Sequence, residues 1–207
     1  MLQQEFERQI SNLIQKGYPS ITGQSEEDFQ KQFEPLCQKV VELEHAGVSA
    51  QKGEVPFVIV IKRDWIDTER AMQLVARKNK AGFSIMASEE LNRFTPIDGI
   101  ELPEGFAYLL VDIDTGEETL NVTPNLAMER IKNENRSPLT IEEGVALITH
   151  FPEVVKRNNG FSLLGSRCGD KRVTALWISE GRPKLGWCWA GNPHTWLGSA
   201  SCQYRFG

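Results

Sequence analysis

The sequence predicts an α+β fold, because helical patterns at the start, strand patterns in the middle and a hairpin near the end follow one another without a repeat or a clear linker. A chain of 207 residues is long enough to bury a substantial core without a disulfide or a metal. Its hydrophobic content of 40% and charged content of 25% exclude a largely disordered or fibrous chain. We expect one domain over residues 1–207, with helices in residues 1–50, a mixed central sheet, and a C-terminal hairpin and Trp/Gly-rich loop in residues 151–207.

The N-terminal part has the apolar spacing of helices. Apolar residues recur at helical spacing between positions 6 and 14, and Gly17 followed by Pro19 supplies a stop. A second helix is expected to begin at Ser25, because Asp28 three residues later imitates a capping box. Pro35 is expected to kink or split this helix. Its predicted apolar face consists of Phe29, Phe33, Leu36, Val40 and Leu43.

The middle of the chain changes to strand patterns. Val55 to Ile61 is a nearly continuous apolar run, which is typical of a strand that is buried on both faces and central in its sheet. Thr123 and Pro124 predict the start of a helix, and residues 140–143 form a capping-box pattern for the next one. Further predictions are a short helix or an irregular connection at 67–78 and strands at 82–86 and 106–114.

The C-terminal part predicts a hairpin. Residues 172–179 and 184–189 have strand composition, and the segment between them, 180–183, has the composition of a hairpin loop. On a strand, Trp187 and Trp189 point to one face and Cys188 to the other.

Charge is distributed unevenly along the chain. The net charge is −5, but residues 151–207 hold eight Lys and Arg against three Asp and Glu, so this part carries +5 and the first 150 residues carry −10. A basic end is suited to an anionic ligand, because local sign governs attraction more than the total charge does. The alternative is that the basic end pairs internally with the acidic body.

The sequence also bears on cellular compartment. The first eight residues carry acidic side chains and lack the apolar core of a secretory signal. The longest strongly apolar run, at residues 55–61, is too short to span a bilayer. We expect a cytoplasmic protein without a membrane partner, whose four cysteines are reduced thiols or ligands.

Two C-terminal segments, Gly165 to Asp170 and Gly186 to Cys202, contain the strongest candidates for a binding site. The first predicts a tight turn with backbone N–H groups and arginines directed at an anion, and the tryptophans of the second predict the walls of a pocket. We expect a small anionic ligand such as a nucleotide, an acidic metabolite or a peptide carboxylate, whereas the acidic chain disfavours nucleic acid. The candidate binding residues are Arg167, Asp170, Arg172, Trp187, Trp189, Asn192, His194, Trp196 and Ser199.

An enzyme is the first alternative. Cys168 is flanked by glycine and close to basic residues, which favour its thiolate, so it is a candidate nucleophile with His194 as its base. Zinc is the corresponding cofactor candidate, because three cysteines and one histidine match a ligand set that zinc favours. The spacing argues against this set, since consecutive candidates lie 20, 6 and 8 residues apart. Its members are Cys168, Cys188, His194 and Cys202.

A structural role is the second alternative. The tryptophans are also suited to a core, with function then located elsewhere, for instance on a partner surface of the N-terminal helices. Glu142 and Glu143 fall in the first turn of a predicted helix, where the helix dipole alone explains them. The sequence contains no P-loop, dinucleotide fingerprint, Gly-x-Ser-x-Gly or His-Glu-x-x-His motif.

The strings at residues 162–173 and 185–202 resemble those of a bacterial family of unknown function. The similarity extends along most of the chain, including residues 121–125 and 138–144. The resemblance implies a full-length cytoplasmic bacterial protein, and it implies no activity, cofactor or partner.

Overall fold

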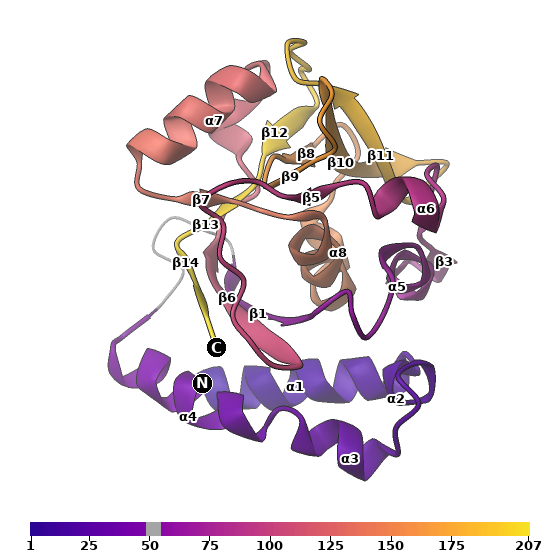
Figure 1. Cartoon of the computed structure of the whole chain (residues 1–207), viewed down its shortest axis with the longest axis vertical. Coiled ribbons are helices and arrows are strands. Elements are labelled where there is room, and N and C mark those ends of the chain that lie inside the picture. Colours follow the sequence, from indigo (N-terminus) through magenta and orange to yellow (C-terminus); the bar gives the residue numbers. More distant parts are fainter. Residues whose placement is uncertain (49–54) are drawn as a thin grey trace.

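The computed structural model describes residues 1–48 and 55–207 and confirms the α+β fold. Its elements form successive layers (Figure 1). The N-terminal helices form the outermost layer, followed by a three-stranded antiparallel sheet, then two helices, and then a five-stranded mixed sheet. The N-terminal layer consists of α1 (Leu2–Gln15), α2 (Tyr18–Ile21), α3 (Glu26–Lys31) and α4 (Glu34–His45).

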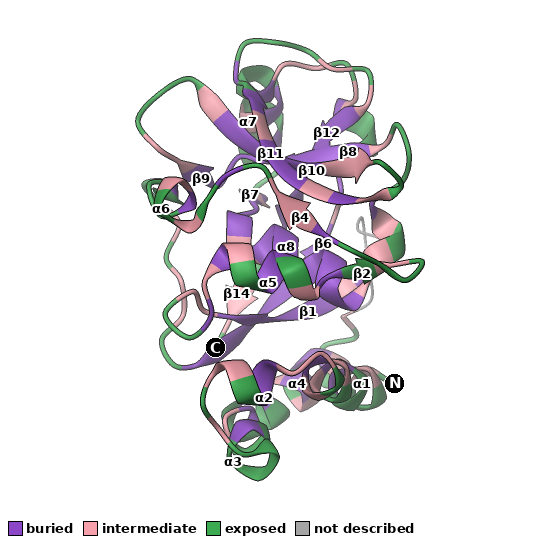
Figure 2. Ribbon diagram, turned by 90° about the vertical axis from the view of Figure 1, so that its right-hand side faces the viewer, coloured by how far each residue is buried: buried purple, intermediate pink, exposed green. Residues whose placement is uncertain are grey.

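The three-stranded sheet has the order β1-β6-β14, and the five-stranded sheet has the order β12-β8-β10-β11-β4. Helix α8 lies between the two sheets with α5 beside it, and its residues are mostly buried, as the purple ribbon in Figure 2 shows. The first sheet contains β1 (Val55–Ile61), β6 (Ala107–Ile113) and β14 (Tyr204–Phe206). The second contains β4 (Phe83–Ser84), β8 (Gly160–Leu163), β10 (Arg172–Ser179), β11 (Arg182–Trp189) and β12 (Leu197–Ser199).

The remaining elements are short or connect the sheets. Helices α5 (Thr68–Leu74) and α8 (Ile141–His150) form the layer between the sheets, and α7 (Pro124–Asn133) lies at the far end of the molecule from α1 (Figure 1). Short strands are β2 (Ala76–Arg77), β3 (Lys80–Ala81), β5 (Thr95–Pro96), β7 (Ser137–Pro138), β9 (Ser166–Arg167) and β13 (Ser201–Cys202). Short helices are α6 (Ser88–Leu91) and the 3-10 turns η1 (Glu117–Thr119) and η2 (Pro152–Val154).

The helix predicted from Ser25 is divided into α3 and α4. The Ser25 hydroxyl accepts a hydrogen bond from the Asp28 backbone N–H, as the capping-box pattern predicts. The division falls just before Pro35, which lies in the first turn of α4, where a proline does not disrupt a helix. All five residues of the predicted apolar face are buried.

Strand β1 is buried as its apolar run predicts, but it is an edge strand, and the centre of its sheet is β6. The prediction of a central position was wrong because β1 has one neighbouring strand, β6, and a side chain takes the place of the second. The Gln9 carboxamide donates to the Phe57 carbonyl at 3.1 Å and accepts from the Ile59 N–H at 2.8 Å. Gln9 is 0% exposed, so α1 closes the β1 edge with a peptide-like group.

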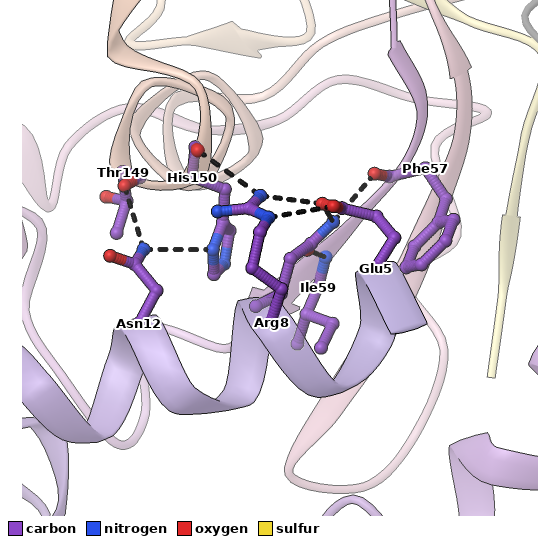
Figure 3. Close-up of polar contacts among 8 residues, drawn as sticks. Glu5, Arg8, Asn12, Phe57, Ile59, Thr149 and His150 are labelled. Atoms are coloured by element: carbon purple, nitrogen blue, oxygen red, sulfur yellow. Dashed lines mark hydrogen bonds and ion pairs between the residues drawn. The ribbon is translucent and has the colours of Figure 1, made fainter. Parts of the chain in front are cut away.

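Further contacts fix α1 against the C-terminal end of α8 (Figure 3). The Asn12 amide donates to the Thr149 carbonyl at 3.0 Å and to the His150 Nδ1 at 3.2 Å. Arg8 pairs with Glu5 on its own helix and lies over the ring of Phe151. The N-terminal layer is therefore bound to the body of the protein by polar contacts as well as by apolar packing.

The predicted hairpin is β10 paired with β11, and its turn at Glu180 and Gly181 has positive φ angles of 56° and 76°. The hairpin separates the tryptophans into two pairs. Trp187 and Trp189 contact each other on the face of the sheet that is directed towards α8, which we call the inner face. Trp177 contacts Trp196 on the opposite, outer face, where α7 also packs.

Candidate functional site

The structure divides the sequence-predicted site residues between the two faces of the five-stranded sheet. On the inner face, Trp187 and Trp189 adjoin a cluster around Arg172 that includes Asp170 and Cys168. On the outer face, the rings of His194 and Trp196 lie 5.3 Å apart. Asn192 is exposed in the turn after β11, and Ser199 is buried against η1, where its N–H donates to the Thr119 hydroxyl. The nine predicted binding residues therefore do not line one common pocket.

Arg172 is occupied by internal partners. Its guanidinium forms ion pairs with Glu90 and with Asp170, and it lies 5.5 Å from the ring centres of both Phe94 and Trp187. The backbone N–H of Arg172, together with the Cys168 thiol and the guanidinium, lowers the pKa of Asp170 to about 2. The charge of Arg172 is thus already balanced by two carboxylates. This cluster stabilises the turn and has little charge left for an anionic ligand.

The arrangement around Cys168 does not favour thiol catalysis. The Cys168 Sγ donates to the Asp170 carboxylate at 3.2 Å. A carboxylate whose pKa is near 2 is a weak base for a thiol, and the predicted base, His194, lies on the other face of the sheet.

The four metal candidates are also dispersed. Cys188 contacts the Ser162 hydroxyl within the outer cluster, and Cys202 lies in the main core. Burial raises the pKa of the Cys188 thiol and raises that of Cys202 to about 12, which disfavours the thiolate form that metals bind. Within residues 1–48 and 55–207, no three His, Cys, Asp or Glu side chains form a group that is able to hold a metal ion.

A different part of the structure forms a cavity with charged walls, which we call the charged cavity. It has a volume of about 250 Å³ and lies where the end of β1, the start of α8, β6 and β5 meet. Strand β5 pairs with β9 of the predicted 165–170 loop, in the register Thr95 with Arg167. The loop identified from the sequence therefore supports one wall of the cavity. The lining residues are Lys62, Arg63, Asp64, Thr95, Pro96, Leu102, Tyr108 and Glu142.

The charges of this cavity are only partly neutralised inside the protein. Arg63 forms an ion pair with Glu142 and donates to the Phe94 carbonyl at 2.9 Å. Lys62 donates to the Pro103 carbonyl at 3.0 Å, and no carboxylate of the described residues forms an ion pair with it. Asp64 is exposed. The Glu142 side chain is only 9% exposed, yet its Oε2 is buried without a hydrogen-bond partner among the described residues.

The neighbouring Glu143 has a contrasting environment. Its carboxylate is fully buried and accepts from the Arg205 guanidinium at 2.5 and 2.8 Å, from the Tyr108 hydroxyl at 2.8 Å and from the Thr140 N–H at 2.7 Å. Burial first, and then the Glu143 charge, raise the pKa of Tyr108 well above its ordinary value. Tyr108 therefore stays neutral, with its hydroxyl bound to Glu143 and its ring forming part of the cavity wall.

Sequence reasoning missed these residues because each has an ordinary explanation. Glu142 and Glu143 belong to the first turn of α8, whose predicted capping box at Thr140 is present. The available signal was the position of Lys62 and Arg63 directly after a fully apolar strand, where long charged side chains remain close to buried groups. The groups that these side chains contact are distant in the sequence, since Glu142 lies 79 residues after Arg63 and Pro103 lies 41 residues after Lys62. A local sequence pattern therefore does not reveal these contacts.

Together these features define an α+β protein with a small cavity whose walls carry both signs of charge. No helix of the described segments, 1–48 and 55–207, is long and apolar enough to cross a membrane. The chain belongs to the family of unknown function DUF5701, whose family model matches residues 12–207. This confirms the resemblance to a family of unknown function along most of the chain. No curated protein and no solved structure matches the chain significantly.

Proposed function

We propose that this protein binds a small zwitterionic molecule with an apolar body in the charged cavity. The volume of about 250 Å³ is slightly below the range of ordinary ligand pockets and is suited to a ligand about the size of an amino acid. This ligand carries an anionic group, as the basic C-terminal part of the sequence predicts. It binds in the cavity beside the 165–170 loop and not in the loop itself.

The observation that carries the proposal is the mixture of charges on one small cavity. An anionic group of the ligand contacts the Lys62 ammonium, which has no carboxylate partner among the described residues, and the adjacent Arg63. A cationic group contacts Asp64 and Glu142. The apolar body packs on Pro96, Leu102 and the Tyr108 ring. Such a site discriminates against ligands that lack one of the two charges, because a charged wall is then left unpaired.

We place this binding activity in the bacterial cytoplasm. All four cysteines are free thiols, and Cys188 and Cys202 are buried, which suits a reducing compartment.

The experiment is calorimetric titration with matched sets of three compounds: an amino acid with an aliphatic side chain, its deaminated acid and its decarboxylated amine. We expect only the amino acid to bind measurably, and to raise the melting temperature as a ligand of the native state does. Lys62→Gln should weaken its binding at least tenfold. Lys132→Gln, on an exposed position of α7, is the matched control and should leave binding unchanged. Equal binding of the amino acid by wild type and Lys62→Gln, or no binding by any member of the sets, rejects the proposal.

A further inference from the structure

The outer face of the five-stranded sheet carries a continuous row of rings and cations. The guanidinium of Arg182 lies 4.2 Å from the Phe83 ring centre, and the Lys184 ammonium lies between two rings, 5.7 Å from Phe83 and 5.1 Å from Trp177. Trp177 in turn contacts the edge of Trp196 at 5.7 Å. We call this the outer aromatic face, consisting of Phe83, Ile85, Trp177, Arg182, Lys184 and Trp196.

These residues share one face because of the strand register. Lys184 pairs with Trp177 across β10 and β11, and with Phe83 across β11 and β4. Side chains at paired positions lie on the same side of a sheet. Gly186 belongs to the same side, because a Cβ built there would meet Trp177 and Ile85. The glycine thus lets the Trp177 ring lie close to the sheet.

Helix α7 covers only part of this side. Its residues Ala127 and Ile131 pack with Val173, Ala175 and Cys188, and Trp177 and Trp196 adjoin that cluster while remaining only partly buried. Ile85 lies beyond the cluster and is 51% exposed, which is a high value for an isoleucine on a sheet. An apolar surface that is left open beside a covered one is suited to a partner.

The two cations of this face are weakly paired. Arg182 pairs with Glu180 at 3.8 Å, and the Glu180 side chain is mostly exposed. Lys184 forms no ion pair with any carboxylate of the described residues, and its contacts are with the two rings. Exposed ion pairs contribute little, so both cations remain available to an external anion. The face therefore presents positive charge on an aromatic and aliphatic base.

We propose that the outer aromatic face binds an extended acidic segment of a partner protein. Carboxylates of the segment pair with Arg182 and Lys184, and an apolar side chain of the segment packs on Ile85 and the adjacent edge of Trp177. The arginine and lysine specify the acidic groups, and the apolar contact supplies the affinity that exposed charge pairs lack.

A protein segment fits this face better than a single strand of nucleic acid. Stacking of bases needs free ring surfaces, but the Phe83 ring already has Arg182 and Lys184 over it and the Trp177 ring lies against Gly186. The chain as a whole carries a net charge of −5, which repels a polyanion. A short segment with a few carboxylates acts within a Debye length of the two cations and is less affected by the rest of the chain.

The test uses fluorescence anisotropy of the full chain with a labelled peptide of alternating glutamate and leucine. The same peptide with glutamine in place of glutamate is the first control, and a labelled oligothymidylate of similar length is the second. We expect the glutamate peptide to bind, its affinity to fall as salt is raised, and the two controls to bind at least tenfold more weakly. Lys184→Glu and Arg182→Glu should each weaken peptide binding at least tenfold, and Ile85→Asp should weaken it severalfold.

Lys31→Glu is the matched control, because it reverses a charge on α3 at the opposite end of the molecule, and it should leave binding unchanged (Figure 1). Near-ultraviolet circular dichroism establishes that each variant is folded, and Ile85→Asp, at an exposed position, remains informative if a charge reversal disturbs the hairpin. The proposal is overturned if the glutamine peptide binds as well as the glutamate peptide, if only the oligothymidylate binds, or if Lys184→Glu and Ile85→Asp both bind like wild type.

Discussion

Two adjacent glutamates at the start of α8 belong to two different regions of the molecule. Glu143 is in the core, where Arg205, Tyr108 and Thr140 satisfy both of its oxygens. Glu142 lies beside the charged cavity, where Arg63 pairs with one oxygen and the other has no partner among the described residues. The same residue type, one position apart on one helix, thus forms part of the architecture in one case and of a candidate site in the other.

The difference is in the completeness of the hydrogen bonding and in the space beside it. A buried polar group whose partners are all supplied by the chain stabilises the fold and has no capacity for a ligand. A buried polar group with a missing partner is costly unless something else supplies the contact. Among the described residues, one oxygen of Glu142 lacks a partner and a cavity of about 250 Å³ lies beside it, whereas both oxygens of Glu143 are paired.

The largest loss of stability is expected at Glu143, whose hydrogen bonds are complete. Glu143→Gln removes a buried charge and leaves the Arg205 guanidinium, which is 7% exposed, without its counter-ion. Breaking a buried ion pair in this way costs about 3–5 kcal/mol of the free energy of unfolding. Urea unfolding followed by circular dichroism measures this loss. A loss below about 1 kcal/mol contradicts the architectural role of Glu143.

His150 tests whether a missing partner alone is enough to mark a ligand site. Its Nδ1 accepts from Asn12 (Figure 3), but its Nε2 is buried without a hydrogen-bond partner among the described residues. The internal cavity beside it, which Leu13 and Tyr18 also line, has a volume of only about 20 Å³. That space holds about one water molecule and no larger ligand. Burial first, and then the charges of Arg8 and Lys16, lower the pKa of His150 to about 3.

The pKa of His150 predicts a loss of stability in acid. The unfolded chain binds a proton on this histidine near pH 6.5, and the folded chain does so only near pH 3, so stability is complete above pH 6.5 and falls as the pH drops between these values. Between pH 7 and pH 4 the expected loss is on the order of 3 kcal/mol. Unfolding of wild type and His150→Gln across this range measures it, and the variant should show a shallower slope. His45→Gln, on the exposed end of α4, is the control, and a slope equal to wild type in His150→Gln rejects the assignment.

A smaller effect is expected at the edge of β1. Gln9→Leu replaces the carboxamide by an apolar side chain of similar size and leaves the Phe57 carbonyl and the Ile59 N–H without their partner. Unsatisfied buried backbone groups cost about 1–3 kcal/mol, and hydrogen exchange at Ile59 should accelerate because the edge opens. Asn12→Leu is the comparison variant on the same helix, because it removes side-chain contacts to α8 without exposing the β1 edge. Equal exchange of Ile59 in both variants indicates that α1 closes this edge by packing alone.

Most of the fold follows from local sequence. Ser25, Thr123 and Thr140 are N-caps as predicted, and the apolar runs of β1 and β6 are strands, because capping and burial depend on residues a few positions apart. The edge position of β1 was not predictable in this way, since it depends on Gln9, 48 residues before Phe57. The C-terminal strands β12 to β14 were also missed, because short strands with glycine and serine have little periodic signal.

The site was less predictable than the fold. Three tryptophans lie on the two strands of the predicted hairpin, but alternation along β10 and β11 sends Trp177 and Trp187 to opposite faces, which only the register of the two strands determines. Arg172 was expected to meet a ligand, and its two carboxylate partners, Glu90 and Asp170, come partly from a helix 82 residues away. Lys62 and Glu142 approach the same cavity from distant parts of the chain, so a tertiary contact and not a motif creates it.

The smallest change in stability is expected at Glu142, whose hydrogen bonding among the described residues is incomplete. The same position should show the largest change in ligand binding. Glu142→Gln removes a carboxylate that has one oxygen without a partner in the described part of the chain, and it leaves Arg63, which is 25% exposed, accessible to water. The free energy of unfolding should therefore change by no more than about 1 kcal/mol, in contrast to Glu143→Gln. The same variant should lose the preference for an amino acid over its deaminated acid, because the amide presents an N–H donor where the ligand ammonium requires an acceptor. If Glu142→Gln and Glu143→Gln destabilise the protein equally, both glutamates are architectural; if Glu142→Gln is stable but retains the preference for the ammonium group, Asp64 alone recognises it.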